Sequence, residues 1–106
     1  MTRSKWTIAL DKYDLPDKKK STLSKFFDVD MDILDDVYDR GLAAARNTGT
    51  RQSVTSDDMW ARARMNKLLI RIDKARKGKK IKDGRGQDVD LILKALNKKK
   101  SEIVFI

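Results

Sequence analysis

A row of basic side chains at helical spacing is the best candidate for a binding site in this sequence. The row lies about a quarter-turn from the apolar stripe of the same predicted helix, so it can face solvent while the stripe builds the core. Guanidinium and ammonium groups bind phosphates and carboxylates, and an indole can stack on a neighbouring guanidinium as a cation–π pair. At 100° per residue, one side of a helix over about 55–77 presents Trp60, Arg64, Lys67, Arg71 and Lys74.

Further basic residues flank this row. Arg51 lies in the preceding polar loop, and Lys77, Lys79 and Lys80 follow the helix. Between residues 62 and 82, ten bases stand against one acid, so this segment accounts for the whole formal net charge of +9. A surface of that sign favours phosphates or an acidic protein surface. The sequence leaves a second interpretation open, in which these bases pair inside the fold with the aspartates of segment 28–39.

The acidic segment 28–39 contains six aspartates and no base. Its acids mimic the spacing of a calcium-binding EF-hand loop, but the position that needs glycine for the turn is Ile33. Segments 21–27 and 31–46 have the apolar spacing of a helix-turn-helix pair. The second helix of that pair would present aspartates to the DNA phosphates, so we expect the topology without the DNA-reading role.

The chain has no cysteine and no histidine. Thiolate chemistry, imidazole bases and the usual zinc sites are therefore absent. Asp57-Asp58 and Asp88…Asp90 resemble paired catalytic carboxylates, but a position at a helix N-terminus explains both pairs. We expect no enzymatic activity, no cofactor, no bound metal and no small-molecule substrate.

The elements that position these residues are predicted to be helices. Apolar residues at helical spacing predict a small all-α bundle of four or five helices, spread over one domain, residues 1–100. An apolar tail, residues 101–106, is expected either to pair as a strand or to dock in a groove. No apolar run is long enough to cross a membrane, and the first residues lack the apolar core of a signal peptide.

Three motifs between Val37 and Arg64 carry a family resemblance. They are Val37-Tyr38-Asp39-Arg40-Gly41, then Gly49-Thr50-Arg51, then Trp60-Ala61-Arg62-Ala63-Arg64. The pattern resembles a domain of unknown function found in short proteins of large DNA viruses of algae and amoebae and in tailed phages. The resemblance covers about Ser4 to Leu91 and implies a viral origin but no activity.

Four of the shared residues suggest physical roles. Gly41 can let either the polar loop or the helix that carries Trp60 approach the 31–46 helix closely. Arg51 and Arg64 can converge beside Trp60 on a carboxylate or phosphate; in the alternative, Trp60 covers the core and both arginines bind nearby carbonyls.

These observations predict a non-enzymatic, small, basic viral structural protein, such as a minor capsid component. Its basic helix face is expected to bind an acidic capsid or virion protein, and contact with membrane head groups is left open. The expected location is the virion, and the host cytoplasm or nucleus during infection. The alternative is a nucleic-acid-binding protein that contacts DNA phosphates without regard to sequence.

Overall fold

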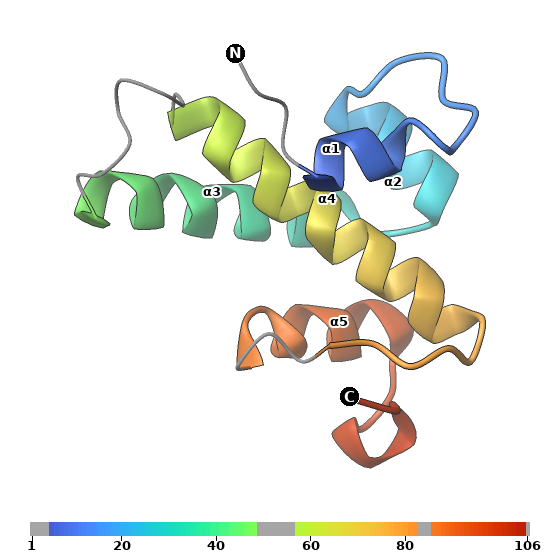
Figure 1. Ribbon diagram of the computed structural model, residues 1–106. Helices are drawn as coiled ribbons and strands as arrows, with labels where there is room; N and C mark the ends of the chain where they lie inside the picture. The colour runs from blue at the N-terminus through green and yellow to red at the C-terminus, as the bar shows by residue number, and fades with distance from the viewer. Residues whose placement is uncertain (1–4, 49–56, 83–85, 106) are drawn as a thin grey trace.

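The longest helix lies at the centre of the fold and the other helices pack around it (Figure 1). The computed structural model describes residues 5–48, 57–82 and 86–105. In these residues it contains α1 (Lys5–Leu10), α2 (Lys20–Phe27), α3 (Met31–Thr48), the central α4 (Asp57–Arg76), α5 (Val89–Leu96) and a short 3-10 turn, η2 (Lys100–Glu102). The predicted all-α fold is confirmed. None of the helices in these ranges is both long and apolar enough to cross a membrane.

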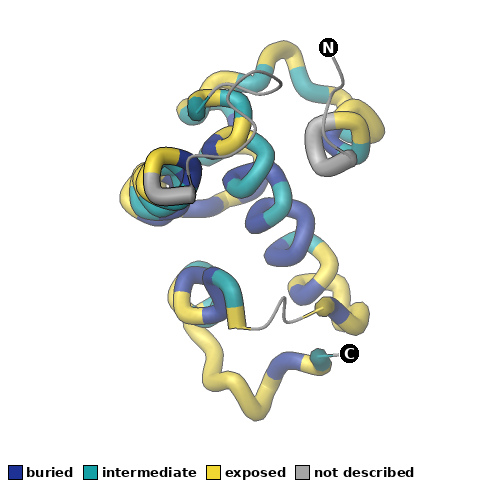
Figure 2. The backbone as a smooth tube through the Cα atoms, turned by 60° about the vertical axis from the view of Figure 1, so that its left-hand side comes forward, coloured by how far each residue is buried: buried dark blue, intermediate teal, exposed yellow. Residues whose placement is uncertain are grey.

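Helix α4 is buried on more sides than its apolar stripe predicted. α1, α3 and α5 all pack against α4, and together they enclose its middle (Figure 2). The predicted core stripe is confirmed, since all five of its members are buried: Ala61, Met65, Leu68, Ile72 and Ala75. Burial extends beyond the stripe to Leu69, Ile70 and Arg71. A helix enclosed in this way keeps little free surface along its central turns.

Helices α3 and α4 make the most extensive contact in the fold, and Gly41 is where they come closest. A Cβ atom added at Gly41 would lie 2.7 Å from the Cα atom of Ala61 and 3.1 Å from its Cβ atom. Only a residue without a side chain fits at that distance. The prediction that Gly41 permits a close approach of the Trp60 helix is confirmed.

Helices α2 and α3 form the predicted helix-turn-helix-like pair. Asp28 ends α2 in the left-handed conformation, and the backbone N–H of Val29 then donates to the carbonyl of Ser24 over 3.0 Å. Helix α2 begins at Lys20, one residue before the predicted segment 21–27.

Asp17 stabilises the start of α2 from outside the helix. Its carboxylate accepts hydrogen bonds from the Thr22 side chain and from the backbone N–H of Lys19, the latter over 2.9 Å. Both bonds lower the pKa of Asp17. Asp17 therefore orders the connector where it enters α2, while the N-cap residue, Lys19, makes no side-chain cap hydrogen bond.

Helix α1 ends at Leu10, and Tyr13 lies beyond its end. The ring of Tyr13 packs edge-on against Phe26 and Phe27, and its hydroxyl donates to Asp73 of α4 over 2.7 Å. Burial, together with this carboxylate, raises the pKa of Tyr13 to about 12. Tyr13 thus fastens the N-terminal segment to α4.

Because the pKa of Tyr13 is raised in the folded chain, its stabilisation is complete below about pH 10 and is lost as the pH rises toward 12. We expect Tyr13→Phe to lower the free energy of unfolding by about 1 kcal/mol at pH 7. The variant should also lose stability less steeply than the wild type between pH 10 and 12, as measured by urea denaturation at several pH values. Equal slopes for the two proteins would contradict this assignment.

The apolar C-terminal tail pairs with the segment that follows α4. Ile81 and Phe105 form an isolated parallel bridge, and the backbone N–H of Ile81 donates to the carbonyl of Val104 over 3.0 Å. Ile103 is buried in the core, and the partly buried Phe105 packs against the same core. In the described residues the tail therefore makes one isolated bridge in place of a strand, and its apolar side chains pack on the core.

Candidate binding surface

The structure breaks up the basic row predicted along α4. Trp60 and Lys74 are exposed at opposite ends of the helix, and Lys67 is half-buried between them. Arg71 is only 4% exposed, so the prediction of an exposed row is wrong at that residue. The reason is physical: the neighbouring elements cover the middle of α4 on the side where Arg71 lies. Arg51 lies outside the described residues.

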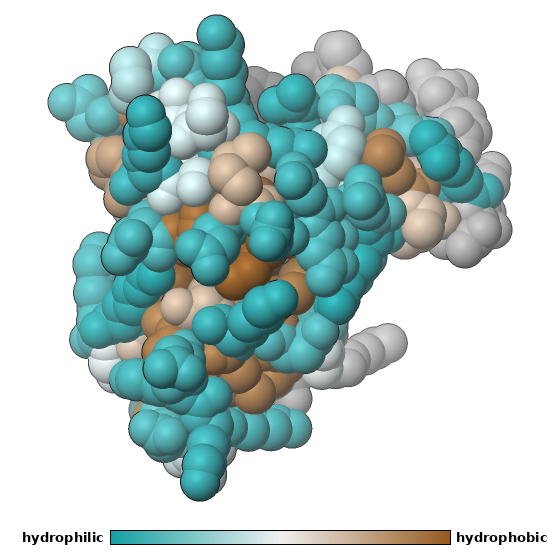
Figure 3. All heavy atoms as spheres, turned by 180° about the vertical axis from the view of Figure 1, so that it is seen from behind, coloured by the Kyte–Doolittle hydropathy of each residue, from teal (hydrophilic) through white to brown (hydrophobic). Residues whose placement is uncertain are grey.

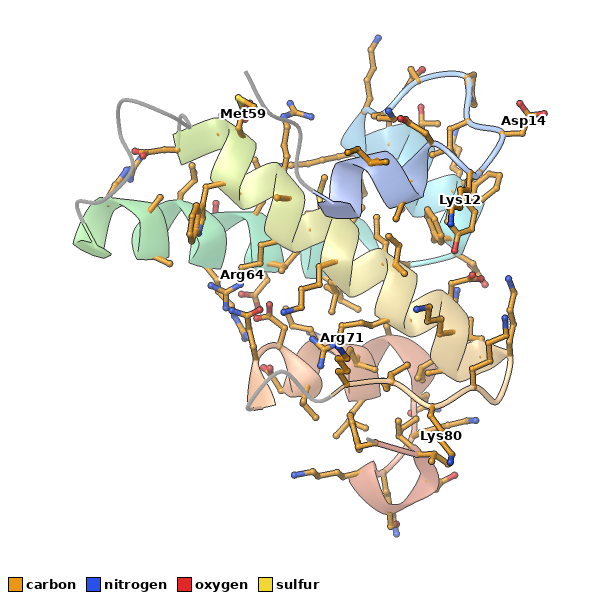
Figure 4. All side chains as sticks on the ribbon, viewed as in Figure 1. Lys12, Asp14, Met59, Arg64, Arg71 and Lys80 are labelled. Carbon is orange, nitrogen blue, oxygen red and sulfur yellow. The ribbon has the colours of Figure 1, made fainter. Side chains whose placement is uncertain are left out.

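Arg64 is bound inside the fold by an aspartate that precedes α5 (Figure 4). Its Nε and Nη2 atoms donate to the two carboxylate oxygens of Asp88, over 2.8 and 2.9 Å. The Asp88 side chain is 2% exposed and the Arg64 side chain 18%. This bidentate geometry is the strongest form of arginine–carboxylate pairing, and it assigns Arg64 a structural role in place of the predicted stacking on Trp60.

Arg40 completes the same cluster from α3. It donates to Asp88 over 3.2 Å, to Asp36 over 2.9 Å and, through both Nη atoms, to Asp90 over 2.9 and 2.8 Å. The hydrogen bonds from Arg40 lower the pKa of Asp90, and Asp90 in turn raises the pKa of Arg40. Asp88 thus lies between two guanidinium groups and joins α3, α4 and the start of α5.

Arg71 and Lys67 hold the connection between α4 and α5. The guanidinium of Arg71 donates to the backbone carbonyls of Lys82 and Gln87, over 3.1 and 2.8 Å. Lys67 donates to the side-chain carbonyl of Gln87 over 3.2 Å. These hydrogen bonds satisfy a buried guanidinium and fix both ends of the connecting segment against the helix.

The remaining described arginines are also bound within the chain. Arg76 donates to the carbonyls of Phe27 and Asp28 at the end of α2, the second over 2.6 Å. Arg62 pairs with Asp58 one turn earlier, and Arg46 approaches Asp57 at 3.8 Å. Each of the six arginines in the described ranges therefore binds a carboxylate or a backbone carbonyl, and the free positive charge of these ranges is carried by lysine.

Exposed lysines gather at the end of the molecule where α4 and the C-terminal tail meet. The bridge between Ile81 and Phe105 brings the segment after α4 beside the tail (Figure 1). No ion pair forms on these lysines within the parts of the chain that the structure describes. We refer to this surface as the lysine pole; its members are Lys79, Lys80, Lys82, Lys98, Lys99 and Lys100.

The lysine pole contains two of the predicted site residues and adds others that sequence reasoning missed. Lys79 and Lys80 were predicted, and Lys77, which pairs with Asp73 over 3.0 Å, lies next to them. Lys82 and the run 98–100 were not predicted. The run is visible in the sequence as three consecutive lysines, but only the pairing of the tail with Ile81 places it beside the end of α4.

The acidic side chains form a separate surface on α3. Of the aspartates predicted on the outer side of this helix, Asp32, Asp35 and Asp39 are exposed, whereas Asp36 is half-buried and bound by Arg40. Asp30, just before the helix, is also exposed. Hydrophilic side chains cover most of the face seen from behind, with apolar atoms visible between them (Figure 3). In the described ranges, the acids form no cluster that would hold a metal ion.

The comparisons with known proteins give a family and no activity. A family model described as a family of unknown function (DUF5824) matches residues 1–91. These are nearly the residues over which the sequence resembles a domain of unknown function, so the match to such a domain is confirmed, whereas the viral or phage origin stays a prediction. No curated protein and no solved structure matches the chain.

Proposed function

We propose that this chain, which belongs to the DUF5824 family of unknown function, is a non-enzymatic protein that attaches to an acidic partner through its lysine pole. One observation carries the proposal: the described arginines are bound within the fold, whereas the six lysines of the pole are exposed and carry no ion pair among the described residues. Excess charge of one sign on one end of a small domain attracts surfaces of the opposite sign.

The choice of lysine indicates the kind of contact. Lysine offers a hydrated point charge on a flexible stem, whereas arginine offers a rigid fork that reads a specific carboxylate or phosphate geometry. Six flexible charges suit a partner that presents many negative groups without a fixed pattern. We therefore expect attachment that depends on charge density and is weakened by salt.

We further propose that the chain is a structural component of a virus particle, such as a minor capsid protein, with an acidic capsid or virion protein as the partner. The resemblance of Val37–Gly41 and Trp60–Arg64 to a domain of short viral and phage proteins supports this origin. Mass spectrometry of purified particles should detect the chain at a constant ratio to the coat protein. Its detection in infected cells together with its absence from purified particles would contradict a structural role.

Nucleic acid is the second candidate partner. The bonds that the described arginines make within the chain favour binding to phosphates over reading of the bases. Specific readout of DNA bases relies mainly on bidentate arginine, asparagine or glutamine contacts. The described arginines are bound internally, so contacts from the lysine pole would be confined to phosphates and independent of sequence. The exposed aspartates on α3 would be repelled by phosphates, which argues against the second helix of the helix-turn-helix-like pair as the DNA-binding element.

Reversal of two charges in the lysine pole is expected to weaken binding to polyanions. We expect the Lys79→Glu/Lys80→Glu variant to bind duplex DNA more weakly than the wild type at every salt concentration. The plot of log K against log salt should have a slope near −5 if six phosphates are neutralised, and it should be about two units shallower in the variant. Fluorescence anisotropy with labelled DNA, and in parallel with labelled polyaspartate, measures both quantities.

The matched control carries the same change of charge elsewhere. Lys12 and Lys25 are exposed, and Figure 4 shows Lys12 beside α1 and α2, away from Lys80. Lys12→Glu/Lys25→Glu should keep the slope of the wild type. Binding of polyaspartate and DNA alike supports a general acidic partner, and binding of DNA alone supports the second candidate. Equal losses in both variants, or no binding of either polyanion at physiological salt, would overturn the proposal.

A further inference from the structure

We propose that the lysine pole of one copy docks on the exposed aspartates of α3 in a second copy, so that the chain assembles head to tail. This inference rests on the proposed function, because it names a partner for the same lysine pole. We refer to the second surface as the acidic face, formed by Asp30, Asp32, Asp35 and Asp39. The chain then carries both halves of one charge-complementary interface.

The acidic face keeps most of its charge within the described chain. Asp32, Asp35 and Asp39 follow one another at spacings of three and four residues, so they lie on one side of α3. Among the described residues, the ion-pairing group from another element is Lys20 of α2, which binds Asp35 over 3.1 Å. Within α3 itself, Arg40 binds Asp36 at the edge of the face. No ion pair in the described ranges is formed by Asp30, Asp32 or Asp39.

The two surfaces do not neutralise each other inside one copy. The lysine pole is built from segment 79–82, which follows α4, and from residues 98–100, which follow α5. The acidic face consists of Asp30, just before α3, and three aspartates in the N-terminal half of α3, and no described ion pair joins the two surfaces. The packing of α3 on α4 and the bridge to the tail fix the positions of both surfaces. Each surface is therefore left to meet its complement on another molecule.

An interface between two different surfaces of the same chain is heterologous. It produces a ring if the rotation between copies closes and an open filament if it does not. Contacts between exposed charges are weak singly and are screened over about 8 Å at physiological ionic strength. We therefore expect association that rises with protein concentration and disappears as salt is added.

Paired charge reversals provide the test. Sedimentation velocity at about 20 mM ionic strength, well below physiological screening, should give the wild type a weight-average mass at least twice that of the monomer. Asp32→Lys/Asp39→Lys and Lys79→Glu/Lys80→Glu should each be monomeric. An equimolar mixture of the two variants should associate again, because each supplies the surface that the other has lost.

A chain that carries all four reversals restores both the complementarity and the net charge of the wild type, so it should also associate. A monomeric mixture together with a monomeric fourfold variant would overturn head-to-tail docking, as would a wild type that stays monomeric at low salt. Failure here is separable from failure of the proposed function. Asp32→Lys/Asp39→Lys retains the lysine pole, so it should still bind polyaspartate and DNA whether or not copies associate.

Discussion

The Gly41→Val variant is expected to lose about 3 kcal/mol of unfolding free energy, a large share of the stability of a domain of this size. An added Cβ atom would meet the backbone of Ala61 at 2.7 Å, and the Cα atom of a helix packed in the core cannot rotate away as a flexible side chain can. The two helices must therefore separate, which also loosens the most extensive contact of the fold. Urea denaturation monitored by circular dichroism measures the loss.

Two further variants separate this clash from the ordinary cost of valine in a helix. Ala43→Val makes a comparable change at an exposed position of α3 and should cost less than about 1 kcal/mol. Gly41→Ala should fall between the two, because alanine favours the helix but its Cβ atom still meets Ala61. Equal stabilities of Gly41→Val and Ala43→Val would contradict the close approach of α3 and α4 at Gly41.

The second large effect is expected at Asp88, whose removal leaves two guanidinium groups without their shared carboxylate. Loss of one partner from a buried ion pair costs about 3–5 kcal/mol, and the partial exposure of Arg40 and Arg64 reduces this to about 2–3 kcal/mol for Asp88→Ala. The backbone adds to the cost, because Asp88 has a φ of 57°, which disfavours alanine more than aspartate or asparagine.

Asp88→Asn and Asp88→Gly separate the cost of the lost ion pair from the cost of backbone strain. Asparagine tolerates the left-handed backbone and removes only the charge, whereas glycine removes the side chain without backbone strain. We expect both to be more stable than Asp88→Ala. Asp90→Ala is the exposed comparison and should cost under 1 kcal/mol, since its side chain is 64% exposed. A small effect of Asp88→Ala, no larger than that of Asp90→Ala, would contradict the role of Asp88 as the centre of the cluster.

The fold was largely predictable because it follows from local periodicity. The apolar stripe of α4 and the glycine of α3 both depend on spacing along a single helix, and both were found in the core. Arg71 could not be placed in this way. Its angle around α4 follows from 100° per residue, but whether that side faces solvent depends on the connection to α5, whose carbonyls bind the guanidinium.

The candidate site was less predictable, because its parts come from distant segments. Arg64 was predicted to bind an acidic group, but its partner, Asp88, lies 24 residues further along the chain. The lysine pole depends on a single bridge between Ile81 and Phe105, and no periodicity in the sequence indicates that bridge. The excess of basic residues was therefore predictable, whereas the surface on which it gathers was not.

The most direct test of the lysine pole is to measure lysine reactivity residue by residue, with no substitution in the chain. The protein would be acetylated with an N-hydroxysuccinimide ester, alone and with duplex DNA or polyaspartate, and each lysine quantified by mass spectrometry. At least one of the two polyanions should lower the acetylation of Lys79, Lys80 and the run 98–100. The acetylation of Lys12 and Lys25 should stay unchanged. Protection centred on Lys67 and Lys74 of α4, or spread evenly over all lysines, would contradict the account.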